Sequence, residues 1–374
     1  MARAAGATIV ALLLAAQASA FRRPAGVARL PAPSRGVNTL GARPVASVPR
    51  ARPTALGANA ALDENSVSGD TFLGALYKFC RPHTIRGTIL ASFAGVAKAL
   101  ADSGGLAACW SWELLPRAAL GLVALLAGNA FIVGINQLYD VEVDKVNKPF
   151  LPIAAGELSP ATAKLLLAVC AVTGPAIVAT QFSPLILQLY ALGTFAGTAY
   201  SVPPFKLKAR GPLAAGMTIA TCRGFLLNFG VYYATLEALG KTFAWSPGVA
   251  FMARFMTVFA AVIAVTKDLP DVEGDRAYGV KTFATRVGVA KVAAGASLAL
   301  ALNYASAIAQ GVFAPAGAFA RGPMVAGHAV LLLGLGRFFL RYRRSGPTNM
   351  DAIKGYYKSI WDLFYLEYLL YIFI

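Results

Sequence analysis

Two short acidic windows hold residues whose types and spacing suit metal chemistry. Seven of the seventeen acidic residues of the chain fall within positions 136–144 and 267–275. In each window, oxygen-bearing side chains recur at the spacing of helical turns, i, i+4, i+8 in the first and i, i+3, i+7 in the second, so each set is expected to share one helical face. These residues are Asn136, Asp140 and Asp144 in the first window and Asp268, Asp271 and Asp275 in the second. Proline is not tolerated deep in a helix, and Pro270 therefore predicts a helix break in the second window.

The ligand types in these windows favour magnesium. All of them are hard oxygens, whereas the whole chain has two histidines and four cysteines, without the spacing of a zinc or iron site. Magnesium is usually held by one or two carboxylates together with substrate phosphates. We therefore expect Mg²⁺ and a diphosphate between the two windows, with Asp140, Asp144, Asp271 and Asp275 as the catalytic carboxylates. The alternative is that these acids only solvate loop ends and pair with nearby lysines.

The composition places these windows in a membrane protein. Apolar residues make up 57% of the chain and charged residues 14%, against about 25% charged in an ordinary globular domain. So few charges could not cover a soluble surface, so most of the surface must face lipid. The first 62 residues contain eight arginines and no acid, which leaves 9 of the 17 net positive charges for the rest of the chain. A soluble enzyme, a disordered protein and a disulfide scaffold are excluded, and no nucleic-acid partner is expected.

Nine apolar stretches predict an all-α, polytopic membrane fold. Each is close to the ~20 residues that a helix needs to cross the hydrocarbon core. Sixteen basic residues precede the first stretch or lie in every second loop, and about four lie on the other side, so the acidic windows are expected on the positive, cytoplasm-like side. The stretches span residues 85–101, 117–138, 161–181, 183–201, 213–235, 247–266, 288–313, 324–342 and 356–374.

The N-terminal segment is typical of a targeting sequence. Residues 1–20 combine Arg3, an apolar run and the small-residue pattern Ala18-Ser19-Ala20, which predicts a signal peptide. Residues 21–62 are acid-free and rich in arginine, as in an organelle transit peptide, which leaves 63–374 as the membrane domain. The two segments together resemble the bipartite presequence of algae with complex plastids. The alternative is a secreted or plasma-membrane protein with a basic linker.

The two windows resemble the two signatures of a known enzyme family. Asn136-Gln137-x-x-Asp140-x-x-x-Asp144 and Lys267-Asp268-x-Pro270-Asp271-x-Glu273-Gly274-Asp275 are similar to the signatures of the intramembrane aromatic prenyltransferases of the UbiA superfamily. The segment 79–85, with its Arg-Pro-His sequence, is similar to that of plastid homogentisate prenyltransferases, and the segment 223–233 to the solanesyl branch of that group. The resemblance covers about residues 72–374.

The resemblance implies a fold and a reaction. The fold would be a UbiA-type helical bundle with a central cavity. The reaction would be Mg²⁺-dependent transfer of a polyprenyl group, solanesyl, from its diphosphate to homogentisate with decarboxylation, in plastoquinone biosynthesis. The partners would be polyprenyl diphosphate, homogentisate and membrane lipid, in a plastid membrane of an alga with the active-site loops facing the stroma.

Several basic and polar residues are candidates for binding the two substrates. Lys148, Lys267, Arg276 and either Lys206 or Lys208 could neutralise the diphosphate, although each could instead be a positive-inside residue. Two departures from the family pattern bear on the site: Gln137 replaces an acid found in many members, and Tyr200 lies two residues further from its lysine, Lys206, than usual. Candidates for the carboxylate of the acceptor and for the cavity wall are Arg81, His83, Arg86, Arg223 and Asn129. His83 could also be an interface histidine, and Asn129 could form an interhelical hydrogen bond.

Three other functions remain open at this stage. A homogentisate phytyltransferase of tocopherol biosynthesis would share all of these motifs. Chlorophyll synthase shares the two acidic windows but not the Arg-Pro-His opening. A quinone-binding membrane scaffold with vestigial windows would need neither metal nor diphosphate.

Overall fold

The computed structural model describes residues 71–105, 112 and 114–374, and all regular elements in this part of the chain are helices. The predicted signal and transit segments, residues 1–62, lie outside the described residues.

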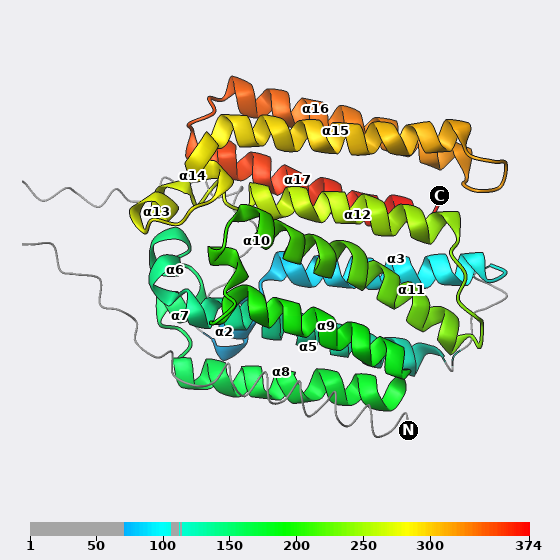
Figure 1. Cartoon of the computed structure of the whole chain (residues 1–374), viewed down its shortest axis with the longest axis horizontal. Coiled ribbons are helices and arrows are strands. Elements are labelled where there is room, and N and C mark those ends of the chain that lie inside the picture. Colours follow the sequence, from blue (N-terminus) through cyan, green and yellow to red (C-terminus); the bar gives the residue numbers. More distant parts are fainter. Residues whose placement is uncertain (1–70, 106–111, 113) are drawn as a thin grey trace, which may run out of the picture.

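Among the residues that the structure describes, nine long helical rods can be distinguished. They run side by side and form the body of the bundle (Figure 1). They confirm that each of the nine predicted stretches is helical. Five of them, α5, α8, α12, α15 and the η4–α16 rod, are long and apolar enough to cross a membrane by length and composition. The rods are α3 (Pro82–Asp102), α5 (Leu114–Tyr139), α8 (Pro160–Gln181), α9 (Pro184–Ser201), α10–η3–α11 (Pro212–Ile219, Ala220–Leu226, Leu227–Ala238), α12 (Pro247–Thr266), α15 (Val289–Phe313), η4–α16 (Pro323–Gly327, His328–Arg344) and α17 (Met350–Tyr371).

Serine caps and prolines in the sequence explain where several of these rods begin. The Ser159 and Ser246 hydroxyls cap α8 and α12 by accepting hydrogen bonds from backbone N–H groups, and a proline follows each serine. Proline suits the first helical position because its missing N–H would have no partner there. Pro184 likewise begins α9, which confirms the predicted separation of α8 from α9.

The short helices gather at one end of the rods. α6, α7, α13 and α14 lie together on the left of Figure 1, next to the ends of the long rods. This end therefore contains both acidic windows. The short helices are α2 (Phe72–Phe79), α6 (Val141–Asn147), α7 (Pro152–Ala155), η2 (Leu207–Ala209), α13 (Val272–Ala277) and α14 (Phe283–Val287).

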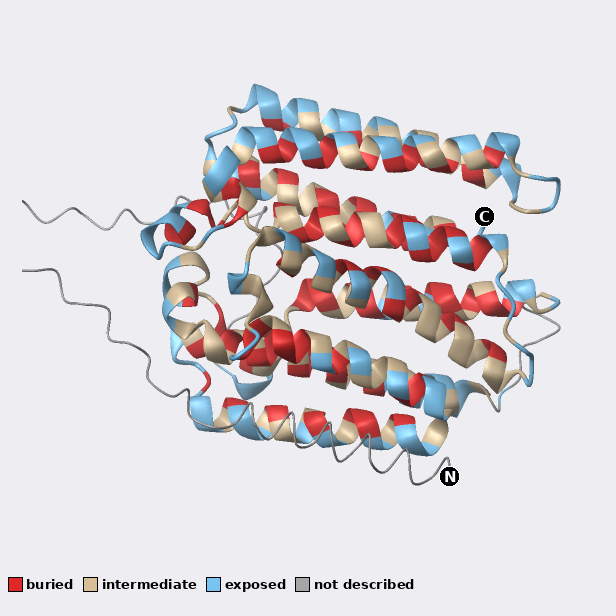
Figure 2. Cartoon of the chain, in the orientation of Figure 1, coloured by how far each residue is buried: buried red, intermediate tan, exposed pale blue. Residues whose placement is uncertain are grey.

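The apolar side chains form separate cores on different sides of the bundle. The largest joins α12, α15, α16 and α17 with part of α3, and a second joins α5 and α8 with α2. The outer faces of α15 and α16 are exposed in Figure 2 and carry leucines such as Leu302 and Leu333. Exposed leucines on long helices are expected where the surface meets lipid and not water.

The structure corrects one prediction about the acidic windows. The first window is not one continuous helical face, because α5 ends at Tyr139 and Asp140 lies outside helical geometry before α6 begins. In the second window, α12 ends at Thr266 and α13 begins at Val272, so the predicted break near Pro270 is confirmed. The carboxylates are thus presented by two helix–turn–helix corners and not by two straight helices.

Candidate active site

Contacts between the end of α6 and the second acidic window hold the two windows close together. The Asn147 side-chain amide donates a hydrogen bond to Asp275 Oδ1 at 3.0 Å, and the ammonium of Lys148 forms an ion pair with Asp271. A Cβ at position 274 would overlap the Asn147 side chain, so Gly274 is required for this close approach. Residues far apart in sequence are therefore held in one site.

Further charges surround the same site. Lys208 forms an ion pair with Asp140, and the Lys267 ammonium lies 2.6 Å from Asp268 Oδ1. Asn136 donates a hydrogen bond to Asp140 Oδ2 at 3.0 Å. The structure thus brings Lys208 against the first window, while Lys206 also lines the cavity nearby without this ion pair.

Burial leaves the carboxylates of the site incompletely compensated. Burial raises the pKa of the Asp144 carboxyl to about 6, and although Arg81 and Lys148 oppose this rise, neighbouring aspartates add to it. Burial, with the nearby charges of Asp271 and Asp268, raises the pKa of Asp275 to about 6 as well. Asp144 Oδ2 is buried without a hydrogen-bond partner among the described residues. A site with clustered acids and a free oxygen lone pair favours a bound cation.

The donor set fits magnesium bound together with a phosphate group. Within the described ranges, no three histidine, cysteine, aspartate or glutamate side chains converge as a complete metal cage. The first window instead offers Asp140, Asp144 and the amide of Asn136, and the second offers Asp268, Asp271 and Asp275. A few carboxylates are the protein share that Mg²⁺ usually takes beside substrate phosphates. The residues that would hold it are Asp140, Asp144, Asp271 and Asp275, with Asn136 and Asp268 adjacent.

A cavity of about 1230 Å³ begins at the acidic windows and continues between the rods. Its wall takes residues from successive turns of α3, α5, α9 and α10–η3–α11, from Thr84 to Leu100 and from Asp140 back to Leu114. Ligand cavities usually measure about 300–1,000 Å³, so this one suits a large ligand. Polar side chains are concentrated near the windows, and the remainder of the wall is mainly apolar.

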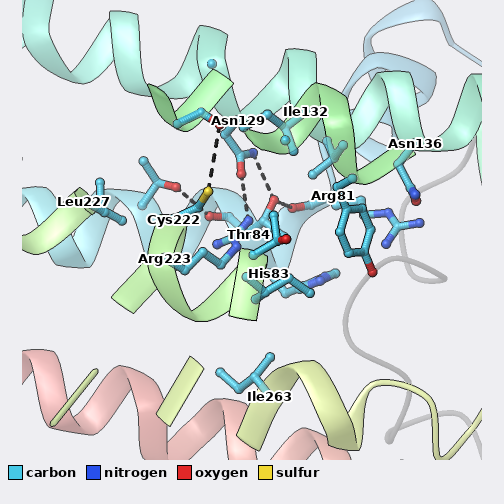
Figure 3. A pocket seen from close by; sticks show the side chains of 18 of the residues that line it. Arg81, His83, Thr84, Asn129, Ile132, Asn136, Cys222, Arg223, Leu227 and Ile263 are labelled. Carbon is cyan, nitrogen blue, oxygen red and sulfur yellow. Dashed lines mark hydrogen bonds between the residues drawn. The ribbon is translucent and has the colours of Figure 1, made fainter. Parts of the chain in front are cut away.

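A half-buried arginine lies at middle depth in the cavity. Arg223 lies in η3, a π-helical segment that links α10 to α11, and its Nη2 donates to Asn129 Oδ1 at 3.0 Å (Figure 3). Asn129 donates in turn to Thr84 Oγ1 at 2.9 Å. Both partners are uncharged, and no carboxylate of the residues that the structure describes forms an ion pair with Arg223. A π-helical turn inside a rod is rare and often marks a functional position.

Aromatic and imidazole groups lie beside this arginine. The ring of His83 meets that of Trp361 edge-on, with 4.9 Å between centroids, and the Tyr365 hydroxyl donates to the His83 carbonyl at 2.8 Å. His83, Arg81 and Trp361 all line the cavity. This part of the wall could hold a flat, anionic aromatic molecule.

Two residues at the cavity wall have unusual backbone geometry. Arg81 and Lys206, with φ of 54° and 36°, are the non-glycine residues with positive φ among those described. Such a conformation costs about 1–3 kcal/mol per residue and persists where the surroundings enforce it, often at ligand sites. Both side chains belong to the expected substrate-binding set.

The structure places most of the predicted site residues at the cavity, but not all. Arg86 and Arg276 do not line it, so those two expectations are not supported by its geometry. Gln137 is turned away from the cavity and donates to the Phe79 carbonyl at 2.7 Å, which explains why an amide can replace an acid there. The predicted residues that line the cavity are Arg81, His83, Asn129, Asn136, Asp140, Asp144, Lys148, Tyr200, Lys206, Lys208, Arg223, Lys267, Asp268, Asp271 and Asp275.

Sequence reasoning missed some residues that shape the site. Asn147 has no role in the sequence analysis, yet its side chain forms the hydrogen bond to Asp275 that connects α6 with the second window. Thr84 and Trp361 were likewise not predicted as site residues, although both line the cavity. Their contacts join segments far apart in the chain, so no local spacing could have identified them.

An all-α membrane bundle with two facing aspartate windows above a long apolar cavity defines the class of intramembrane prenyltransferases. The sequence model of the UbiA prenyltransferase family matches residues 90–360, and the chain belongs to this family.

Two similar relatives are plant proteins whose names call them chloroplastic. The chain is 55% identical over 293 residues to a protein named "Probable homogentisate phytyltransferase 2, chloroplastic" of Oryza sativa subsp. japonica, covering 78% of this chain and 76% of the relative. It is 50% identical over 303 residues to the homogentisate solanesyltransferase of Arabidopsis thaliana, covering 81% and 77%. A solved UbiA homologue from Archaeoglobus fulgidus, bound to GPP and Mg²⁺, shares the fold with a TM-score of 0.53, at 19% identity and over 80% of this chain and 99% of that one.

Proposed function

We propose that this protein transfers a polyprenyl group, solanesyl, from its diphosphate to homogentisate in a Mg²⁺-dependent and decarboxylating reaction of plastoquinone biosynthesis. The observation that carries the proposal is the pair of interlocked aspartate windows at the mouth of a long apolar cavity with an arginine inside. The relatives named above, which are enzymes for homogentisate, support it.

The basic side chains at the mouth would bind the diphosphate of the donor. Lys148 forms an ion pair with Asp271, and Lys208 forms one with Asp140. Both ammonium groups therefore lie where they would contact the phosphate oxygens of a donor bound next to these carboxylates. Magnesium, when bound, neutralises the diphosphate as a leaving group. Lysines placed beforehand add to this stabilisation because they need not reorganise as charge develops.

The apolar wall below the mouth would protect the reactive allylic carbon. When its bond to the diphosphate oxygen breaks, that carbon becomes an electrophile that water would destroy. The rods exclude water there, because Ile132, Leu226 and Ile263 line this part of the cavity. The aromatic ring of the acceptor is then the available nucleophile.

Arg223 would hold the carboxylate of the acceptor. Its guanidinium donates to the neutral Asn129, so an anionic ligand would complete its charge balance in a low-dielectric setting. His83 and Arg81 line the wall on the way to the mouth. The overall reaction conserves protons: the ring loses one proton on prenylation, and the side chain of homogentisate gains one when it releases CO₂.

Phytyl transfer is the second candidate. The highest identity among the relatives described here, 55%, belongs to a protein named as a phytyltransferase. The volume and extent of the cavity favour the longer solanesyl chain.

The same reasoning proposes a location. The two relatives are chloroplastic by name, and five helices suit a membrane span, so we place the protein in a plastid membrane. The basic residues beside the acidic windows favour a stromal orientation of that end. Lipid would surround the rods.

The decisive experiment supplies purified protein with labelled homogentisate, Mg²⁺ and a set of prenyl diphosphates. We expect a decarboxylated prenyl quinol, and we expect Asp140→Asn and Asp271→Asn each to lower kcat/KM at least about a hundredfold, since each removes a charge from the metal and diphosphate site. Glu142→Gln is the matched control, because Glu142 lies in the same window but pairs with the exposed Lys145. If folded protein forms no product with any donor, the proposed prenyltransferase activity is refuted.

A further inference from the structure

A second pocket opens on the outside of the bundle, at the end opposite the acidic windows. It lies between the start of α12, the end of α15 and the loop that follows α15, which is at the right of Figure 1. Its volume is about 630 Å³, within the usual range of ligand pockets, and it shares no lining residue with the central cavity. The reaction site therefore does not account for this outer pocket.

The outer pocket contains an arginine without a charged partner. Among the described residues that line it, only Arg254 is charged. Arg254 lies on the exposed face of α12, about 10 Å along the helix from its first residue, Pro247. Its Nη1 donates a hydrogen bond to Ser306 Oγ at 3.1 Å, whereas a guanidinium has five N–H donors. In the part of the chain that the structure describes, Arg254 forms no ion pair.

The sequence around the outer pocket supplies no acid that could balance this charge. α12 contains neither aspartate nor glutamate, and none occurs from residue 276 to residue 350, which includes α15 and the loop after it. A second arginine lies at the rim, since Arg321 Nη2 is 3.4 Å from the carbonyl oxygen of Ala314, which lines the pocket. A cation at membrane depth is costly without a counter-charge. An anion that balances these arginines must therefore come from another molecule.

Aromatic packing holds the pocket open in a fixed shape. The ring of Phe319, from the loop after α15, meets the ring of the buried Phe251 on α12 edge-on, with 6.0 Å between centroids. Both rings line the pocket. The loop is thereby packed against α12, and the space between them is present before a ligand binds.

The facing side of α15 changes from polar to apolar towards the middle of the bundle. Gln310 lines the pocket, and Gln310 and Arg254 both donate to Ser306 Oγ, so three polar side chains meet at one level. At further steps of four residues along the same face come Leu302 and Leu298, which are 63% and 61% exposed. From Gln310 to Leu298 this strip extends over about 18 Å. A polar end followed by an exposed apolar strip matches the headgroup and the acyl chain of a lipid.

We propose that the outer pocket binds the anionic headgroup of a membrane lipid, with its phosphate on Arg254 and an acyl chain along Leu302 and Leu298. Arginine suits this ligand because its planar fork can bind two phosphate oxygens at once. A lipid uses both parts of the site, whereas a free phosphate ion uses only the arginine. The site goes beyond the proposed prenyl transfer and does not depend on it.

The test measures the unfolding temperature of the full chain, purified in a neutral detergent and depleted of lipid, without substrates. Phosphatidylglycerol should raise this temperature by about 3 °C or more above the value with phosphatidylcholine of the same acyl chains, because a ligand that binds only the folded state stabilises it. Arg254→Gln should weaken phosphatidylglycerol binding by about tenfold or more in a titration, and Arg254→Lys should weaken it less because the charge remains. Arg337→Gln is the matched control, since Arg337 is an exposed arginine of α16 that lines neither pocket.

A second variant tests the space instead of the charge. Ala250→Trp would fill the pocket beside Arg254 and keep the arginine, so it should also weaken phosphatidylglycerol binding. Equal stabilisation by the two lipids, or unchanged phosphatidylglycerol binding in both Arg254→Gln and Ala250→Trp, would overturn the proposal. Glycerol 3-phosphate separates a lipid from a soluble anion: equal stabilisation by this compound at the same concentration would overturn the lipid role. None of these measurements involves prenyl transfer, so their outcome and that of the proposed function are independent.

Discussion

Single residues at the site have roles that their neighbours define. Arg223 is a cation in the interior of a membrane bundle, where an uncompensated charge is costly. Its hydrogen-bond partner Asn129 is fixed by Thr84, so the guanidinium is oriented before any ligand binds. Such preorganisation lets the binding of an anionic acceptor take place without a further ordering cost.

Replacing this arginine tests its role. Arg223→Met should raise KM for homogentisate by about 10–100-fold, as expected for loss of a hydrogen bond to a charged group worth about 1.5–3 kcal/mol, with a smaller effect on KM for the donor. The matched control is Arg254→Met, since Arg254 is also an arginine of a long rod but is exposed and bonds Ser306 at 3.1 Å. If KM for homogentisate is unchanged in Arg223→Met, Arg223 does not bind the carboxylate of the acceptor, and Arg81 or His83 would be the next candidate.

The carboxylates of the windows predict a pH dependence of the metal requirement. The pKa of Asp144 and of Asp275 is raised to about 6 by burial, so both groups are charged above that pH and protonated below it. A cation must then displace a proton in acid. The Mg²⁺ concentration for half-maximal activity should therefore rise as pH falls from about 7.5 to about 5, and excess Mg²⁺ should restore activity. A requirement that stays constant over this range would contradict the assignment of these groups as ligands.

At the scale of elements, the joint between α10 and α11 decides where Arg223 points. η3 packs closely on α12, and a Cβ on Gly224 would overlap the backbone of Thr257. The Asn228 side-chain amide donates to the Gly224 carbonyl at 2.6 Å, which ties the first turn of α11 to η3.

Gly224→Ala should therefore destabilise the protein. Overpacking against a backbone costs about 1–3 kcal/mol and should displace η3, which would lower both the unfolding temperature and the acceptor affinity. Gly216→Ala on α10 is the matched control, because its Cβ would meet no atom within 4 Å. Thermal unfolding in detergent measures the difference, and equal stability of the two variants would argue against close packing at η3.

The sequence allowed the long elements to be predicted better than their joints. Apolar length placed α8, α9 and α12 within a few residues of their observed bounds. The π-helical turn η3 and the break at Asp140 have no local sequence signature, because they arise from packing against other rods. The helical spacing of Asn136, Asp140 and Asp144 therefore predicted one helical face, whereas the chain turns at Asp140 between α5 and α6.

At the scale of the whole molecule, contacts between distant segments explain what the sequence could not show. The site residues were identifiable by type and spacing, but the pairing of Lys148 with Asp271 and of Asn147 with Asp275 depends on how α6 meets α13. Similarly, the fully buried His328 lies 3.0 Å from Glu367 between α16 and α17. Two residues 39 positions apart give no indication of such a pair in a single sequence.

The long cavity also has a consequence for how the bundle holds together. Its apolar cores lie apart, one around α12, α15, α16 and α17 and another around α5 and α8, and the cavity wall draws on rods from both. A prenyl tail lying in that space would touch both sides and supply the apolar contacts that the polypeptide itself lacks there. A ligand that binds only the folded state stabilises it, so the bound donor would serve as part of the hydrophobic interior. In each catalytic cycle the prenylated product would leave this space and a new donor would fill it.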